Sequence, residues 1–260
     1  MKTTVRLTES AVMLAAAFVL SLIPVVQMPF GGDVTLASML PILVIAYRHG
    51  TPWGLLVGFA GSLLQLLTGL DNLSYATSAW AAIAIILLDY AIAFTVLGLG
   101  GLFRKVSRSQ STALVSGALL CCVLRYLCHF VSGFTVWRGV DIPLDEALLY
   151  SVSYNAAYMV PETVITVAAA LALSVTMDLT SEQPRRAAVT KGKPVVLVSA
   201  LASIVFAAVG AVWLFRAIQT EDGFAFTAVT TGDLIAVGIF AALAVVSAVI
   251  GTFAGKKPKE

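Results

Sequence analysis

The sequence predicts an all-α polytopic membrane protein built as one compact helical bundle. Of its 260 residues, 59% are hydrophobic and only 12% are charged, whereas soluble domains are about a quarter charged. The mean hydropathy is +0.96. The apolar runs are continuous over helical lengths, while the strands of a membrane β-barrel would alternate. A net charge of +2 gives no reason to expect nucleic acid as a partner.

Eight apolar segments are expected to cross the bilayer, since a helical crossing needs about 20 apolar residues. Lys2 and Arg6 precede the first segment like the start of a signal peptide. No clear small-residue cleavage site precedes Pro24, so we interpret this segment as a retained helix. The second is short and contains Pro41, so we expect it to be tilted or partly buried. The predicted spans are 10–27, 36–47, 52–70, 79–102, 112–136, 149–177, 194–216 and 232–254.

The distribution of basic residues orients the bundle, because loops on the cytoplasmic side of a membrane are enriched in lysine and arginine. The loops on the other side hold only Arg138 and Arg216, together with seven acidic residues. Both termini are therefore predicted to be cytoplasmic, which requires an even number of crossings. On the cytoplasmic side fall 13 of the 16 basic residues: Lys2, Arg6, Arg48, Arg104, Lys105, Arg108, Arg185, Arg186, Lys191, Lys193, Lys256, Lys257 and Lys259.

A polar linker at 181–194 divides the predicted spans into two groups. Residues 1–180 contain six spans rich in aromatic and polar side chains. Residues 195–260 contain two spans of almost pure Ala, Val, Ile and Phe, followed by a basic tail. These two spans are either a lipid-facing appendage, which we favour, or a surface for a partner. Apart from Arg216 and Asp233 at the ends of the last two spans, every ionisable residue inside a span precedes the linker, so residues 1–182 are expected to suffice for ligand binding.

Several residues inside the predicted spans are polar or ionisable, which is costly in a bilayer and usually functional. Four-residue spacing places them in sets on common helix faces. Asp89 and Tyr90 are flanked only by apolar residues in the fourth span. The fifth span carries Arg125, His129, Gly133 and Trp137, and the sixth carries Tyr150, Tyr154, Tyr158 and Glu162, with Asn155 beside them.

At a rise of about 1.5 Å per residue, this polar set occupies the outer half of the bilayer. It predicts a funnel that opens outward and is closed below by apolar residues, which suits capture of a small molecule. Aromatic faces beside a carboxylate suit a cation, since a desolvated cation–π contact contributes about 2 kcal/mol. Asn155 offers a donor and an acceptor to the edge of a heterocycle.

Structural explanations compete with these assignments. Trp137 and Tyr150 could be aromatic residues of the membrane interface, and His129 could be a hydrogen-bonded packing residue. Arg125 and Glu162 lie at matching depth, and we favour a buried ion pair that fastens two helices over direct ligand contact. The cysteines, all in one apolar run, are interpreted as core residues, with no metal site. They are Cys121, Cys122 and Cys128.

Three segments together resemble the ThiT family, the thiamine-binding S components of energy-coupling factor (ECF) vitamin transporters. They are LLDYAIAF, RYLCHFVSGFTVW and YSVSYNAAYMVPE, and LTESAVMLAAAFVLSLIP is similar to the first helix of the family. The resemblance covers about residues 5–178 and implies a six-helix binding protein in a bacterial plasma membrane. It implies no catalytic residues and no cofactor, with thiamine as ligand. Partners would be a membrane-embedded T component and two ATPases.

The resemblance also implies roles for particular residues. Ala11 and Ala15 match the small-residue pattern by which the first helix docks on the T component. Some relatives have glutamate at Asp89 and lysine at Arg125, and residues 27–37 would lie over the pocket with contacts that the sequence does not assign. The implied pocket residues are Asp89, Tyr90, His129, Gly133, Trp137, Tyr150 and Asn155.

Three alternatives stay open. An S component for another vitamin or a thiamine precursor would use a similar pocket. An intramembrane enzyme could use His129 with Asp89 or Glu162, although no nucleophile motif or metal-ligand cluster accompanies them. An autonomous secondary transporter would need inverted repeats or broken central helices, and neither is evident in the sequence.

Overall fold

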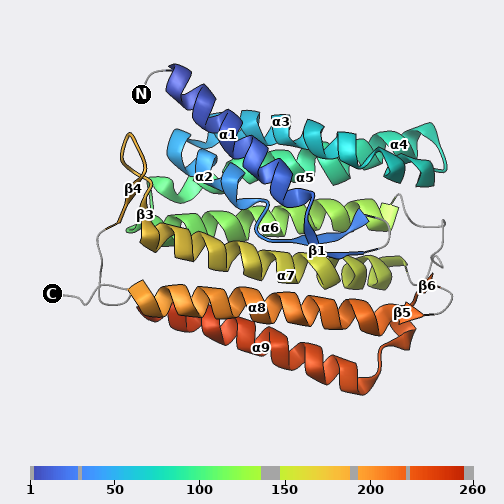
Figure 1. Ribbon diagram of the computed structural model, residues 1–260. Helices are drawn as coiled ribbons and strands as arrows, with labels where there is room; N and C mark the ends of the chain where they lie inside the picture. The colour runs from blue at the N-terminus through green and yellow to red at the C-terminus, as the bar shows by residue number, and fades with distance from the viewer. Residues whose placement is uncertain (1–2, 29–30, 136–146, 188–192, 221–222, 255–260) are drawn as a thin grey trace.

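The computed structural model describes residues 3–28, 31–135, 147–187, 193–220 and 223–254. The predicted all-α membrane architecture is confirmed, because seven helices in these ranges are long and apolar enough to span a bilayer. They run side by side along one bundle, and three short two-stranded sheets lie between them. The first helix begins and the last one ends at the same end of the bundle (Figure 1).

The first part of the chain alternates two long helices with a hairpin and a short helix. Helix α1 ends three residues before Pro24, which lacks an N–H donor and disfavours helix at the preceding residue. The antiparallel β1–β2 hairpin follows. The elements are α1 (Thr3–Ser21), β1 (Pro24–Gln27), β2 (Asp33–Thr35), α2 (Leu40–His49) and α3 (Thr51–Thr68).

Two of the predicted spans therefore need correction. The first helix covers 3–21, not 10–27, because the chain turns into the hairpin at Pro24. The second segment supplies a helix of only 10 residues, so the described structure has seven candidate spans where the sequence predicted eight. The expectation that this segment is buried is confirmed, since residues 41–48 are all buried. The β1–β2 hairpin lies between α1 and α2 in the chain.

The fourth span is continuous from Ala79 to Arg104 but changes its helical form along the way. The side chain of Ser78 caps it by accepting the Ala81 N–H at 3.1 Å. A π-helical stretch contains Asp89, and such stretches are frequent at functional sites. The elements are η2 (Leu70–Tyr75), α4 (Ala79–Ile85), η3 (Ile86–Ile92), α5 (Ala93–Thr95) and η4 (Val96–Arg104).

The remaining helices pack in chain order across the bundle (Figure 1). Hairpin β3–β4 lies between α7 and α8, near the end where α1 begins, and hairpin β5–β6 lies between α8 and α9 at the other end. The elements are α6 (Gln110–Thr135), α7 (Ala147–Thr176), β3 (Met177–Asp178), β4 (Arg185–Arg186), α8 (Lys193–Ile218), β5 (Gln219–Thr220), β6 (Gly223–Phe224), η5 (Phe226–Ala228) and α9 (Thr231–Ala254).

Glycines bring α3 and the fourth span into close contact, as small residues do in membrane helix pairs. A Cβ atom on Gly98 would lie 2.2 Å from the backbone nitrogen of Leu55, and one on Gly58 would lie 2.9 Å from the carbonyl of Phe94. The two helices therefore meet backbone to backbone. This close approach holds the fourth span, with Asp89 on it, against the core.

A buried arginine ties three segments together at the end where α1 begins. Arg48, at the end of α2, forms an ion pair with Glu9 of α1. It also donates to the carbonyls of Leu179, Ser181 and Glu182 at 2.6, 3.2 and 3.2 Å. Because a buried charge needs partners, these bonds fix α1, α2 and the segment after α7 relative to one another.

The last two helices do more than face lipid. Helix α8 packs along α7 and also contacts strand β1 of the hairpin. Val26 and Val34 of the hairpin share one buried apolar cluster with Ala207 and Ala211 of α8. Helix α9 covers α8 and leaves most of its apolar side chains exposed, as expected for the outermost helix of a bundle in lipid.

Candidate functional site

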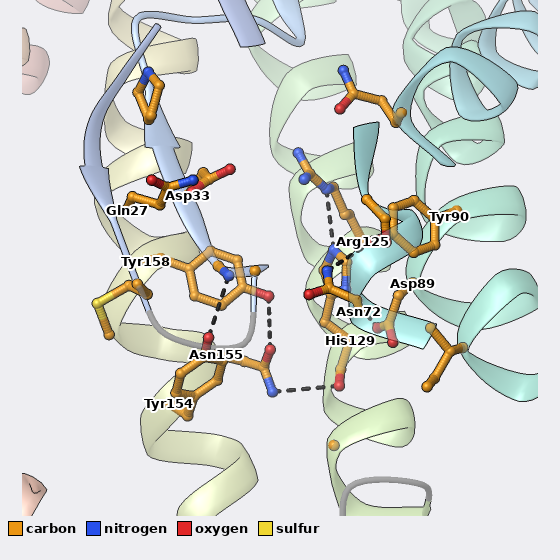
Figure 2. Close-up of a pocket in the computed structure, with 18 of the residues that line it drawn as sticks. Gln27, Asp33, Asn72, Asp89, Tyr90, Arg125, His129, Tyr154, Asn155 and Tyr158 are labelled. Atoms are coloured by element: carbon orange, nitrogen blue, oxygen red, sulfur yellow. Dashed lines mark hydrogen bonds and ion pairs between the residues drawn. The ribbon is translucent and has the colours of Figure 1, made fainter. Parts of the chain in front are cut away.

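A cavity of about 480 Å³ lies between the β1–β2 hairpin, the end of α3, the fourth span, α6 and α7 (Figure 2). This is within the usual size range of small-molecule sites. Ser21 at the end of α1 and Thr68 at the end of α3 line it, so it lies toward the end of the bundle opposite the start of α1. Its polar lining includes Gln27, Asp33, Gln65, Asn72, Asp89, Tyr90, Arg125, His129, Tyr150, Ser151, Tyr154, Asn155 and Tyr158.

The carboxylate of Asp89 is held in place by two side chains of α6. His129 Nδ1 lies 2.9 Å from Asp89 Oδ1, and the hydroxyl of Ser132 donates to Asp89 Oδ2 at 2.5 Å. His129 and Ser132 are three residues apart and share one helix face. These two bonds fix the direction of the Asp89 carboxylate on the cavity wall.

Arg125 extends this arrangement by one more hydrogen bond. Its Nε–H donates to His129 Nε2 at 3.2 Å, and its guanidinium lies 4.3 Å from the ring centre of Phe94. Because arginine only donates, His129 must accept at Nε2 and carry its proton on Nδ1, facing Asp89. The histidine is therefore held as the neutral Nδ1–H tautomer, and Arg125 offsets part of the Asp89 charge.

Three tyrosines at four-residue spacing line the opposite wall on α7. The rings of Tyr150 and Tyr154 stack with centroids 6.0 Å apart, and Tyr154 meets Tyr158 edge to face at 5.7 Å. Tyr158 also meets the ring of His129 across the cavity at 6.0 Å. These aromatic faces, next to the Asp89 carboxylate, form the surroundings that an organic cation prefers.

Asn155 is buried between the two walls. Its Nδ2 donates to the carbonyl of Ser151 at 2.8 Å, and its Oδ1 accepts the hydroxyl of Tyr158 at 2.8 Å. A Cβ atom on Gly133 would lie 2.4 Å from Ser151 Oγ. Glycine at this position therefore lets α6 and α7 approach closely beside Asn155.

The structure brings together six of the seven pocket residues that the resemblance implied. Asp89, Tyr90, His129, Gly133, Tyr150 and Asn155 all line the cavity. Trp137 lies outside the described residues. The hydroxyl of Tyr90 donates to the carbonyl of Gly69 at 3.0 Å and accepts from Asn72 at 2.8 Å, so it also shapes the rim.

The expected ion pair between Arg125 and Glu162 needs correction. Both residues are described, and no direct ion pair joins them. Glu162 is 1% exposed and accepts two bonds from Thr35 of the hairpin, at 2.5 Å from its N–H and 2.7 Å from its hydroxyl. The buried carboxylate therefore anchors strand β2 to α7, while Arg125 bonds to His129 on its own helix.

Sequence reasoning missed the contribution of the hairpin and the part that Arg125 plays in the cavity wall. Gln27, Gly32 and Asp33 line the cavity, and the N–H of Gly32 donates to the hydroxyl of Tyr154 at 3.2 Å. Pro24 and the adjacent glycines at 31–32 are turn signals, but the pairing partner of a strand this short cannot be read from local sequence.

Comparisons with known proteins show which family this chain is similar to. A family model described as Thiamine transporter protein (Thia_YuaJ) matches residues 7–181. The chain is 34% identical over 176 residues to Thiamine transporter ThiT of Bacillus subtilis (strain 168), a match that covers 63% of this chain and 87% of the relative. It is 27% identical over 182 residues to Thiamine transporter ThiT of Lacticaseibacillus paracasei, covering 64% of this chain and 85% of the relative.

A solved structure is similar as well. It is titled as native-SAD phasing for ThiT from Listeria monocytogenes, with a TM-score of 0.52 and 27% identity. The match covers 64% of this chain and 91% of that one. The similarity thus accounts for about the first 180 residues and leaves α8 and α9 outside it.

The contacts of Glu162 predict how two double-mutant cycles differ. Thr35→Val and Glu162→Gln remove the same buried hydrogen bonds, so their losses of thermal stability should be strongly non-additive, by about 1–3 kcal/mol. Arg125→Met and Glu162→Gln remove different contacts and should add within about 0.5 kcal/mol. Melting temperatures of the purified variants measure both cycles. A strongly non-additive loss of stability for Arg125→Met and Glu162→Gln would instead support the ion pair that the sequence suggested.

Proposed function

The chain belongs to the Thia_YuaJ family of thiamine transporters, and we propose that it binds thiamine in the cavity between α6, α7 and the β1–β2 hairpin. It is the S component of an ECF-type importer and not an enzyme. The observation that carries the binding proposal is the fixed Asp89 carboxylate on a wall faced by aromatic rings. Thiamine has a permanently cationic thiazolium ring, which a desolvated carboxylate and aromatic faces attract.

The remaining pocket residues suit the other parts of thiamine. Asn155 and Tyr150 line the same wall and would contact the aminopyrimidine and the hydroxyethyl group by hydrogen bonds and stacking. Tyr90 and Gly133 would shape the space around the ligand, and His129 would orient Asp89. Trp137 would add a stacking face, by resemblance to the family alone.

We propose that the cavity faces the outside of a bacterial cell. The start of α1 and the end of α9 lie at the opposite end of the bundle from the cavity. The residues around that end include Arg6, Arg48 and Arg104, and the positive-inside rule places such residues in the cytoplasm. Both termini would then be cytoplasmic, and thiamine would enter from outside.

Import against a gradient requires partners, because the described chain shows no nucleotide-binding motif of its own. We propose a T component and two ATPase subunits, with α1 as the docking helix. Ala11 and Ala15 of α1 are exposed, whereas Ser10 and Ala17 face the bundle. An exposed face of small residues allows another membrane helix to approach closely.

For residues 195–260, which lie beyond the family model's match, we propose a two-helix appendage after a linker at 181–194. Helix α8 covers the hairpin on its outer side, yet the residues lining the cavity all precede the linker. Lipid tails are as apolar as the side chains of α8, so lipid can replace these contacts with little loss of free energy.

The charge of Asp89 predicts the effect of removing it. Asp89→Asn keeps the shape of the side chain but removes the partner of the thiazolium, and charge-assisted contacts contribute about 1.5–3 kcal/mol. Thiamine should bind at least about tenfold more weakly, measured by calorimetry on the purified protein. An analogue with a neutral ring in place of thiazolium should lose less affinity than thiamine does on the Asp89→Asn substitution.

Asp178→Asn is the matched control, because Asp178 lies in β3 near the other end of the bundle. It should bind thiamine as the wild type does. Unchanged thiamine affinity in a folded Asp89→Asn variant would remove the main physical support for thiamine as the cavity ligand.

If α1 docks on the T component, substitutions on its exposed face should affect uptake but not binding of thiamine. Replacing both Ala11 and Ala15 with Trp should abolish thiamine uptake in cells by blocking close helix approach, while the isolated protein still binds thiamine. The control replaces Ala241 and Ala242, two exposed residues of α9, with Trp and should leave uptake intact. Normal uptake with Trp at both α1 positions would contradict docking through α1.

The appendage assignment predicts that α8 and α9 are dispensable for binding. A protein ending after residue 187 keeps strand β4 paired with β3 and keeps the carbonyl partners of Arg48. In lipid nanodiscs its affinity for thiamine should stay within about threefold of the full chain, or about 0.7 kcal/mol. A folded truncated protein that no longer binds would show that α8 shapes the cavity through the hairpin.

A further inference from the structure

We propose that Asp33, on strand β2 of the hairpin, is a second carboxylate that contacts the cationic ligand from the wall opposite Asp89. This inference rests on the proposed binding of thiamine and adds a specificity-determining residue to that site. Neither the sequence motifs nor the family model's description points to Asp33.

The first observation is the hydrogen bonding of the Asp33 carboxylate. Asp33 lines the cavity, and its Oδ1 is buried with no hydrogen-bond partner among the described residues. Asp89, on the facing wall of the cavity, differs because it accepts from His129 and Ser132. Glu162, which lies behind the hairpin, accepts twice from Thr35. A buried acceptor without a partner is costly, so a ligand that supplies a donor or a positive charge gains from meeting it.

The second observation is the placement of Asp33 across the cavity. Figure 2 shows Asp33 and Gln27 projecting from the hairpin on one side, while Arg125, His129 and Asp89 come from the other. Asp33 pairs in register with Gln27 on β1, so neither strand can shift without the other. Within the described ranges no direct ion pair joins Asp33 to Arg125. The Arg125 side chain instead donates to His129.

The hairpin backbone is held firmly enough to present this side chain. Two residues beyond Asp33, Thr35 donates twice to Glu162 of α7. One residue before it, the N–H of Gly32 donates to Tyr154, and a Cβ atom there would lie 2.7 Å from the ring of Tyr158. Glycine thus lets the strand rest directly on the tyrosine wall. The carboxylate is positioned before the ligand arrives.

The electrostatics around Asp33 make its charge sensitive to pH. Burial raises the pKa of Asp33 to about 6, and the nearby guanidinium of Arg125 opposes this increase. The other titratable or charged groups that line the cavity or face Asp33 from α7 are Asp71, Asp89, Tyr90, His129, Tyr150, Tyr154, Tyr158 and Glu162.

The sign of the pH effect follows from the fixed charge of thiamine. Above pH 6 Asp33 is ionised and attracts the thiazolium, and below pH 6 it takes up a proton and the attraction is lost. A bound cation favours the ionised form, so the pKa of Asp33 in the complex is lower than in the free protein. Affinity should therefore fall as the pH drops below about 6.

The test compares Asp33→Asn with the wild type at pH 7.5 and at pH 5.0, by calorimetry with thiamine on the full chain. At the higher pH the variant should bind about tenfold more weakly, a difference of about 1.4 kcal/mol. At the lower pH the two should differ by less than about threefold. This comparison cancels other groups that titrate in both proteins, including Glu162, His129 and the aminopyrimidine of the ligand.

Two further variants separate the outcomes. Glu182→Gln removes a carboxylate outside the cavity and should match the wild type at both pH values. Asp33→Glu keeps the charge and should keep the pH dependence, even if packing of the hairpin changes. Equal affinity of Asp33→Asn and wild type at pH 7.5, or a ratio that does not change with pH, would overturn the assignment of Asp33 while leaving thiamine binding intact. Failure of the wild type to bind thiamine would overturn both.

Discussion

The site depends on one buried carboxylate that is fixed before any ligand arrives. Asp89 is held by His129 and Ser132, and Arg125 fixes the tautomer of the histidine. Such a charge is tolerable inside a membrane protein only with hydrogen-bonding partners at the correct distance. The π-helical stretch directs Asp89 toward α6, and glycine contacts between α3 and the fourth span hold that stretch in place. The packing of the fourth span therefore determines where the Asp89 carboxylate meets a ligand.

The second constraint is the β1–β2 hairpin, which lines the cavity. Buried backbone polar groups must be paired or must line a cavity. Strands β1 and β2 satisfy this requirement by pairing with each other, by bonding to Tyr154 and Glu162, and by facing the cavity. The departure from a regular helix is thus what creates the binding site. It also explains why Asp33 Oδ1, a buried oxygen with no hydrogen-bond partner among the described residues, can persist there.

The sequence predicted the helical membrane class, the polar helix faces and, through the family resemblance, six residues that line the cavity. The class and the helix faces could be predicted because composition and four-residue spacing act locally along a helix. The six cavity residues came from the resemblance, and their roles in binding stay a prediction. It did not predict the hairpin, because a strand of three or four residues is defined by its pairing and not by its own pattern. Glu162 was assigned to the wrong partner for a similar reason. Matching depth on two helices permits contact between Arg125 and Glu162, but rotation of each helix and the presence of Thr35 decide it.

The most direct test of this account is an experimental structure of the purified protein with thiamine bound. The account predicts thiamine in the cavity between α6, α7 and the hairpin, with its thiazolium ring within about 4–6 Å of the Asp89 carboxylate, the range in which opposite charges attract strongly. His129 should still bond to both Asp89 and Arg125. Thiamine bound outside this cavity, or inside it with the thiazolium turned away from Asp89, would contradict the central claim.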